Sequence, residues 1–248
     1  MLLDGKHAIV YGGGGAIGGA VARALAREGA TVHLAGRTPA TLDAVAEDIR
    51  AAGGTAHTAQ VDALDEAAVD AHADGVAASA GAIDISFNAI SYGDVQGTPL
   101  AEMPLADFER PVVTATRTTR AAARHMIRQR SGVLLMFGGD GGRQPIRDYS
   151  IGGFVVALNA VEALRRQLAA ELGPHGIRSL TLHTGGVPES MPADLAGRDA
   201  ITAGLVGATM LGRTTLDDVG DVASFAASDK ARSMTATAIN ITCGAVAD

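Results

Sequence analysis

The stretch HAIVYGGGGAIG, residues 7–18, decides the fold of this 248-residue chain. Residues 7–11 form an apolar run typical of a buried β-strand, and residues 20–27 are typical of an α-helix. A strand, a glycine turn and a helix in this order are typical of a dinucleotide-binding loop. The alternative is a glycine turn with no ligand.

The glycines matter because a pyrophosphate must approach the backbone closely, and residues without side chains allow this approach. The first turn of the following helix then offers N–H groups and a positive dipole end to the anion. The sequence therefore predicts dinucleotide contacts at Gly12, Gly14, Gly15, Ala16, Ile17 and Gly18.

Apolar strand-like runs alternate with helical patterns along the whole chain, which predicts a doubly wound parallel sheet with helices on both faces. Glycines and a Gly-Pro pair end most of the helices. We expect one domain over residues 1–248, with a mobile substrate loop over residues 188–214. The seven strands are expected near 7–11, 31–35, 55–60, 83–88, 132–137, 177–182 and 238–242, and the helices near 16–28, 39–52, 65–80, 104–129, 152–172 and 215–228.

Composition excludes several classes of function. The net charge is −7 and no predicted face carries a basic cluster, so nucleic-acid and anionic-membrane partners are not expected. No run reaches about 18 apolar residues, so no transmembrane helix is expected. The single cysteine, Cys243, excludes an internal disulfide and a multi-cysteine metal site, and no metal is expected. These features predict a cytoplasmic enzyme with a small-molecule substrate.

The end of the second predicted strand indicates which dinucleotide binds. An acidic residue there would bind both ribose hydroxyls, whereas an arginine accommodates a 2′-phosphate. The sequence has Gly36 followed by Arg37, which favours NADP(H) over NAD(H), unless Arg37 is only a solvated charge. Asp62, after the third strand, is predicted either to accept a hydrogen bond from the adenine amino group or to cap the helix that starts near Asp65.

Several further segments resemble one family, the short-chain dehydrogenases/reductases. The resemblance implies a single-domain Rossmann fold, a dinucleotide bound by Asn88, Ala89 and the backbone of Val187, and assembly as a homotetramer or homodimer. The segments that carry it are YGGGGAIG at 11–18, DISFNA at 84–89, LAAELGPHGIR at 168–178, TGGVPES at 184–190 and the tail from Leu211-Gly212-Arg213 to residues 225–229.

The chain departs from this family where the chemistry is expected. Members usually carry a Tyr-x-x-x-Lys pair with a Ser and an Asn; the Tyr transfers the proton, and the Lys lowers the Tyr pKa. The only lysines here are Lys6 and Lys230, neither in the 152–172 helix. A gap-free alignment places Phe154 and Leu158 at the Tyr and Lys positions. The alternative, with Tyr149 as the Tyr, needs an insertion that would rotate the helix's apolar face.

Two tyrosines remain as candidate proton donors. Tyr149 either reaches the pocket or is a surface or interface residue. Tyr92 follows the fourth strand, where open α/β sheets bind ligands, or else packs within its loop. The usual Ser falls in the segment of Gly138 and Gly139, which has no hydroxyl.

Three functions remain open at this point. The first is an atypical NADP(H)-dependent oxidoreductase that acts on a small carbonyl or conjugated enone with a non-standard proton donor. The second is an NADP(H)-binding protein without redox turnover, in a regulatory or partner role. The third is the same scaffold reused for non-redox cyclisation or isomerisation.

Overall fold

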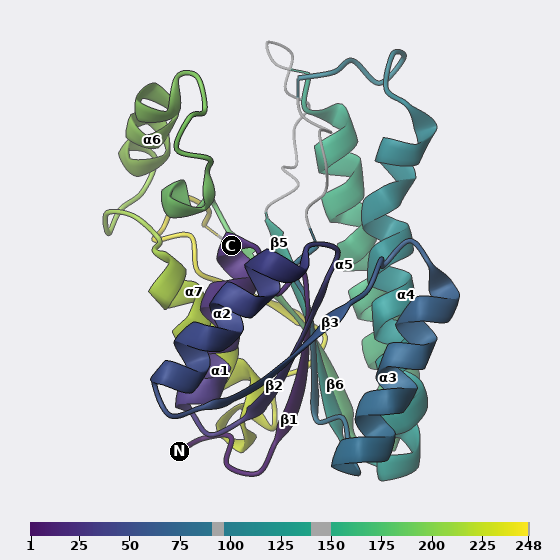
Figure 1. The fold of residues 1–248 in the computed structure, drawn as a ribbon. Helices are drawn as coiled ribbons and strands as arrows, with labels where there is room; N and C mark the ends of the chain where they lie inside the picture. Colours follow the sequence, from purple (N-terminus) through teal and green to yellow (C-terminus); the bar gives the residue numbers. More distant parts are fainter. Residues whose placement is uncertain (91–96, 140–149, 248) are drawn as a thin grey trace.

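Seven parallel strands form one sheet in the order β3-β2-β1-β4-β5-β6-β7 in this computed structural model (Figure 1). The structure describes residues 1–90, 97–139 and 150–247. The predicted doubly wound sheet is confirmed. The strands are β1 (His7–Tyr11), β2 (Thr31–Gly36), β3 (Thr55–Gln60), β4 (Ile85–Asn88), β5 (Gly132–Gly139), β6 (Ile177–Thr184) and β7 (Thr237–Asn240). The helices are α1 (Ala16–Arg27), α2 (Pro39–Ala51), α3 (Glu66–Ala80), α4 (Leu105–Gln129), α5 (Gly152–Leu172), α6 (Arg198–Gly207) and α7 (Leu216–Ala227).

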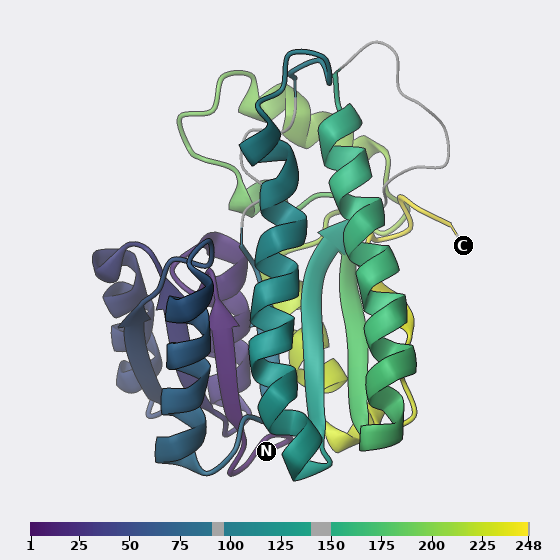
Figure 2. The same ribbon diagram turned by 90° about the vertical axis from the view of Figure 1, so that its right-hand side faces the viewer.

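Helices cover both faces of the sheet. Helices α1, α2 and α7 lie on one face, and α3, α4 and α5 lie side by side on the other (Figures 1 and 2). Alternate strand residues face the two layers, as the pleat requires: Val10 packs with α1 and α2, whereas Ile9 packs with α3 and α4. The inner strands β1, β2, β4, β5 and β6 are therefore largely buried on both faces, which explains their apolar runs, whereas the edge strands β3 and β7 are more exposed.

Local signals fix the helix ends. The side chain of Asp65 accepts a hydrogen bond from the Ala68 N–H and caps α3, and Gly81 ends that helix in the left-handed conformation. At the start of α7, Thr215 and Asp218 form a reciprocal capping box. These caps agree with the helix boundaries expected from the sequence.

Helix α6 is the main difference from the sequence prediction. It lies inside residues 188–214, which were predicted as a mobile substrate loop and not among the helices. No residue of α6 is buried, and Ile201 is 44% exposed, so the helix lacks the apolar stripe by which helices are recognised in sequences. Its Leu205 packs against Gly186, where a Cβ atom would lie 2.8 Å from the leucine Cδ2.

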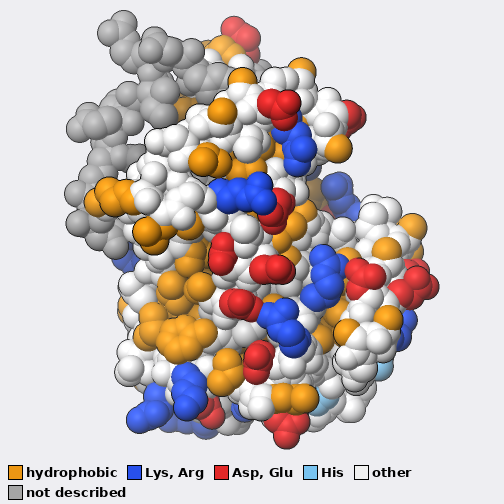
Figure 3. Space-filling model, turned by 90° about the vertical axis from the view of Figure 1, so that its left-hand side faces the viewer, with side chains coloured by type: hydrophobic (Ala, Val, Ile, Leu, Met, Phe, Trp, Pro, Cys, Tyr) orange, Lys and Arg blue, Asp and Glu red, His pale blue; other side chains and the backbone are white. Residues whose placement is uncertain are grey.

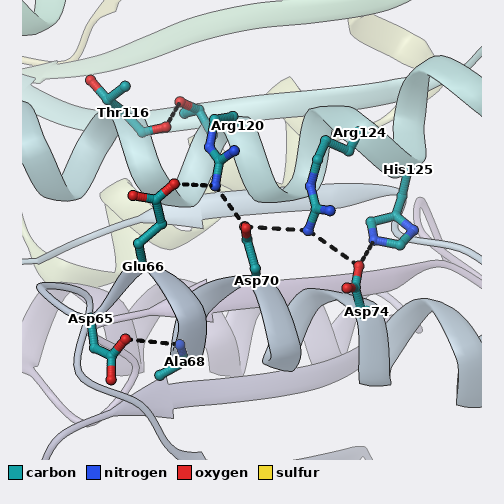
Figure 4. A network of polar contacts seen from close by, with 10 residues as sticks. Asp65, Glu66, Ala68, Asp70, Asp74, Thr116, Arg120, Arg124 and His125 are labelled. Carbon is teal, nitrogen blue, oxygen red and sulfur yellow. Dashed lines mark hydrogen bonds and ion pairs between the residues drawn. The ribbon is translucent and has the colours of Figure 1, made fainter.

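Ion pairs tie α3 to α4 (Figure 4). Arg120 bonds Glu66 and Asp70 at 2.8 and 2.7 Å, and Arg124 contacts Asp70 and Asp74, both at 3.2 Å. The hydrogen bond from His125 lowers the pKa of Asp74. Networks of this kind are more effective than isolated surface pairs. They hold the position of α4 relative to the sheet edge described below.

Charges on the α1, α2 and α7 side are mixed. Figure 3 shows acidic and basic side chains interspersed with hydrophobic ones on this face. Arg23 of α1 pairs with Asp48 of α2 at 3.1 Å, and Arg27 pairs with Asp221 of α7. These two arginines of α1 therefore pair with carboxylates of neighbouring helices. Among the residues that the structure describes, no helix is both long enough and apolar enough to cross a membrane.

Candidate functional site

A cavity of about 400 Å³ opens at the carboxyl ends of β1, β2, β3 and β4. This is the edge at which open α/β sheets bind ligands, at the point where strand order reverses between β1 and β4. Predicted residues that line it are Gly12, Gly14, Gly15, Arg37, Asp62 and Ala89. Residues far apart in sequence therefore meet in one cavity, as the dinucleotide hypothesis requires.

The glycine loop forms the floor of the cavity. Gly12 has a φ of +78°, which favours glycine, and a Cβ atom there would lie 2.6 Å from the Ala89 carbonyl oxygen. A Cβ atom on Gly18 would overlap the carbonyl oxygen of Gly12. The N–H groups of Gly12 and Gly13 donate to the Ala35 carbonyl at 2.8 and 3.2 Å. The loop is thus held against β2 and β4 with bare backbone facing the cavity.

The first turn of α1 follows directly. Ala16, Ile17 and Gly18 belong to the turn whose N–H groups have no partners within a helix. The Ile17 side chain packs against the core, and none of the three side chains lines the cavity. Any role of these residues in nucleotide binding is therefore one of backbone N–H groups, which suits an anion. The bare loop and this helix end fit the diphosphate of a dinucleotide.

One end of the cavity carries Arg37, together with Thr38 and Thr41 of the segment that opens α2. Asp62 faces the same cavity, and its Oδ1 accepts a hydrogen bond from the Leu64 N–H at 2.9 Å. The alternative prediction that Asp62 caps the following helix is wrong, because Asp65 occupies that position. Asp62 is therefore a residue of the cavity wall and not the cap of α3.

Besides Ala16, Ile17 and Gly18, two more predicted cofactor residues lie outside this cavity. Asn88 is buried at the end of β4, and its Oδ1 accepts a hydrogen bond from the Ile90 N–H at 3.0 Å. Val187 is buried after β6, where its carbonyl accepts hydrogen bonds from the N–H and the hydroxyl of Ser190. Asn88 thus shapes the turn that presents Ala89, while Val187 stands beyond β5 at the far side of the same sheet edge.

The predicted catalytic region is only partly described. Tyr92 and Tyr149 lie outside the described residues. Phe154 is half-buried in the first turn of α5, and Leu158, one turn further on, is 2% exposed. A Cβ atom on Gly139 would lie 3.7 Å from the Leu158 Cδ1. In the gap-free alignment, the position expected for the Lys is therefore held by Leu158, whose alkyl side chain faces the end of β5.

The sequence interpretation missed Tyr11, Arg110 and Thr114, which also line the cavity. Tyr11 is buried, and burial, followed by the nearby charge of Asp70, raises the pKa of its phenol. It therefore stays protonated at ordinary pH. Tyr11 was visible inside the glycine motif, but nothing in the sequence separates Arg110 from the other arginines of its amphipathic helix.

A second cavity, of about 540 Å³, lies between α3 and strands β1–β3 and is lined by four histidines: His7, His33, His57 and His72. The His7 Nδ1 and His33 Nε2 are 3.4 Å apart, and the rings of His33 and His57 stack at 5.2 Å. Burial lowers the pKa of His33 and of His72 to about 4. Within the described ranges no group of three or more ligands is arranged to hold a metal.

Comparisons with known proteins agree with this geometry. The family model described as enoyl-(acyl carrier protein) reductase matches residues 14–245. An uncharacterised oxidoreductase of Mycobacterium tuberculosis (strain CDC 1551 / Oshkosh) is 36% identical over 229 residues, which cover 90% of this chain and 84% of that protein. The galactitol 2-dehydrogenase of Rhizobium johnstonii is 30% identical, covering 98% and 95%.

A solved structure is similar along the full length of both chains. It is a short-chain dehydrogenase from Burkholderia cenocepacia J2315 in complex with NADP, with a TM-score of 0.86, 29% identity and 100% coverage of each chain. The strand order, the glycine-floored cavity and these matches lead to one conclusion. The chain belongs to the short-chain dehydrogenase/reductase family of oxidoreductases.

Proposed function

We propose that this protein is an atypical NADP(H)-dependent oxidoreductase that acts on a small carbonyl or conjugated enone with a non-standard proton donor. The observation that carries the proposal is the glycine-floored cavity with Arg37 at its ribose end. The names of the relatives support redox chemistry: one is a galactitol 2-dehydrogenase, and another is solved with NADP.

The preference for NADP(H) rests on charge. Arg37 lines the cavity where the adenosine ribose is expected, and Thr38 and Thr41 add hydroxyl groups beside it. A guanidinium at this point complements a 2′-phosphate, whereas a carboxylate would bind the ribose diol. Asp62, the acidic residue among the described lining residues, belongs to the segment after β3 and suits the adenine amino group.

The non-standard chemistry rests on Phe154 and Leu158. When bound, NADPH supplies a hydride, and the protein must supply or admit a proton. A buried leucine holds no ribose hydroxyl and lowers no pKa, so the usual proton transfer has no support at this position. Alkyl and aryl side chains suit an apolar conjugated substrate. Tyr149 and Tyr92 are the proposed donors of the proton.

Two alternatives follow from the same substitutions. With the usual Tyr and Lys positions filled by Phe154 and Leu158, the chain could bind NADP(H) without redox turnover, in a regulatory or partner role. It could also use the fold for cyclisation or isomerisation. In each case we expect a cytoplasmic homotetramer or homodimer.

One experiment separates these functions. Dissociation constants for NADPH and NADH are measured by nucleotide fluorescence, and NADPH oxidation is then followed across a panel of ketones and conjugated enones. Oxidation of an enone or ketone, reduced by Tyr149→Phe or Tyr92→Phe, is the expected result. Tight binding without NADPH oxidation in the presence of any substrate would reject the oxidoreductase proposal. Failure to bind either nucleotide would reject every proposed function that depends on NADP(H).

A further inference from the structure

Helix α4 contributes a cation to the nucleotide cavity. Arg110 and Thr114 lie one helical turn apart and both line the cavity. The Arg110 side chain is 28% exposed, and its Nη2 pairs with Asp107 at 3.0 Å. Its Nε is buried and has no hydrogen-bond partner among the residues that the structure describes. A buried guanidinium N–H without a partner is costly and calls for a ligand atom or a water.

The two arginines of the cavity stand on opposite sides of the glycine loop. Arg37 follows β2, whereas Arg110 approaches from α4 together with Ala89 and Ile90, which follow β4. Strand β1, which carries the loop, lies between β2 and β4 in the sheet. Arg110 is therefore separated from the ribose end by the glycine floor, where the diphosphate of a dinucleotide is expected.

The backbone under Arg110 is held firmly. Pro111 is buried, and the Thr114 hydroxyl donates to the Arg110 carbonyl at 2.9 Å. Further along α4, Arg120 and Arg124 bind the carboxylates of α3 (Figure 4). The guanidinium is thus presented from a fixed helix rather than from a loop, which limits the entropy lost when a ligand binds.

The charges of the cavity wall favour an anion. Its charged lining residues within the described part of the chain are Arg37, Asp62 and Arg110, which together carry one net positive charge. Asp107 neutralises part of the Arg110 charge. Its carboxylate accepts from Nη2, however, and no described residue accepts from Nε. Arginine presents five N–H donors in a fork that suits phosphate oxygens, so one carboxylate partner does not exhaust it.

We infer that Arg110 binds the diphosphate of the dinucleotide from the α4 wall. This inference rests on the proposed nucleotide-binding function. It divides the work between two cations: Arg37 distinguishes the 2′-phosphate, and Arg110 binds an anion that NADPH and NADH share. Arg110 thereby sets the affinity for both dinucleotides without selecting between them.

The test compares Arg110→Gln with Arg166→Gln, which removes the same charge from an exposed position of α5 outside the cavity. Dissociation constants are measured for NADPH and NADH, and adenosine is used as a competitor without phosphate. We expect Arg110→Gln to weaken both dinucleotides about ten-fold, by similar factors. The affinity for adenosine, measured by competition, should be the same in Arg110→Gln as in the unsubstituted protein. Arg166→Gln should bind both dinucleotides as tightly as the unsubstituted protein does. Arg110→Lys keeps the charge and should lose less affinity.

Other outcomes overturn the inference. Unchanged affinity in a folded Arg110→Gln, as checked by circular dichroism, would exclude a contact. A loss of affinity confined to NADPH would mean that Arg110 contacts the 2′-phosphate instead. An equal loss of affinity for adenosine would mean that Arg110 stacks on the base. If the unsubstituted protein binds neither dinucleotide, the proposed function fails first; if it binds both and only the Arg110→Gln effect is missing, the Arg110 assignment alone is wrong.

Discussion

Acid should destabilise the folded chain through His33. This side chain is 7% exposed and faces His7 of β1, His57 of β3 and His72 of α3 across one cavity. Burial, and then the three neighbouring imidazoles, lowers its pKa from 6.5 to about 4. Between these two values the unfolded chain binds more protons than the folded chain, so the free energy of unfolding falls as the pH falls.

The size of the effect follows from the two pKa values. The difference between a pKa of 6.5 in the unfolded chain and about 4 in the folded chain corresponds to about 3 kcal/mol in the free energy of unfolding. This stability is complete above about pH 6.5 and is lost by about pH 4. At about pH 5 the loss is roughly 2 kcal/mol relative to pH 7.5. His72, whose pKa is also lowered to about 4 by burial, adds a loss in the same direction.

Urea unfolding followed by circular dichroism measures this loss. The unsubstituted protein and His33→Gln are unfolded at about pH 7.5 and about pH 5, and the pH-dependent change is compared rather than the absolute stability. The variant should lose about 2 kcal/mol less on acidification. His175→Gln is the matched control, because His175 lies in a short 3₁₀ turn outside the histidine cavity. An equal loss in the unsubstituted protein and His33→Gln would refute the reasoning.

Three further predictions concern the nucleotide cavity and the helix ends. Arg37→Gln should weaken NADPH binding by ten-fold or more and NADH much less, as measured by nucleotide fluorescence; equal effects would contradict the 2′-phosphate assignment. Gly18→Ala should weaken both nucleotides by at least about ten-fold while circular dichroism stays unchanged, because the new Cβ atom would displace the Gly12 carbonyl; normal binding would show that the loop tolerates the shift. Thr215→Ala should lower the free energy of unfolding by about 1 kcal/mol in urea, because it removes the hydroxyl that caps α7 and bonds Asp218; an unchanged value would mean that the cap contributes nothing.

The sequence predicted the alternation of strands and helices because each element carries its own signal. Continuous apolar runs marked strands buried on both faces, and residues such as Gly81 and Asp65 marked helix ends. The glycine loop could also be predicted from the sequence, since its geometry depends on consecutive residues. Helix α6 could not be predicted, because no apolar stripe and no buried residue distinguish it.

The cavity itself depends on contacts that sequence order hides. Arg110 resembles the other arginines of α4 until the sheet order places that helix beside the glycine loop. The four histidines are likewise scattered over three strands and one helix. His33 and His57 become neighbours only through the register of β2 against β3. Spatial clusters of this kind follow from tertiary packing, for which a single sequence carries no local signal.

The end of β5 shows how much room this segment leaves for side chains. A Cβ atom on Gly139 would lie 3.1 Å from the Thr184 carbonyl oxygen, so a small side chain could be accommodated there if that carbonyl moved by a few tenths of an ångström. At Gly138 the new atom would lie 2.8 Å from the Thr181 methyl group. A lysine in place of Leu158 is a harder change, because this position is buried and an ammonium group there would be removed from water. A small hydroxyl-bearing side chain is therefore easier to accommodate at this strand end than a lysine is at position 158 of the helix.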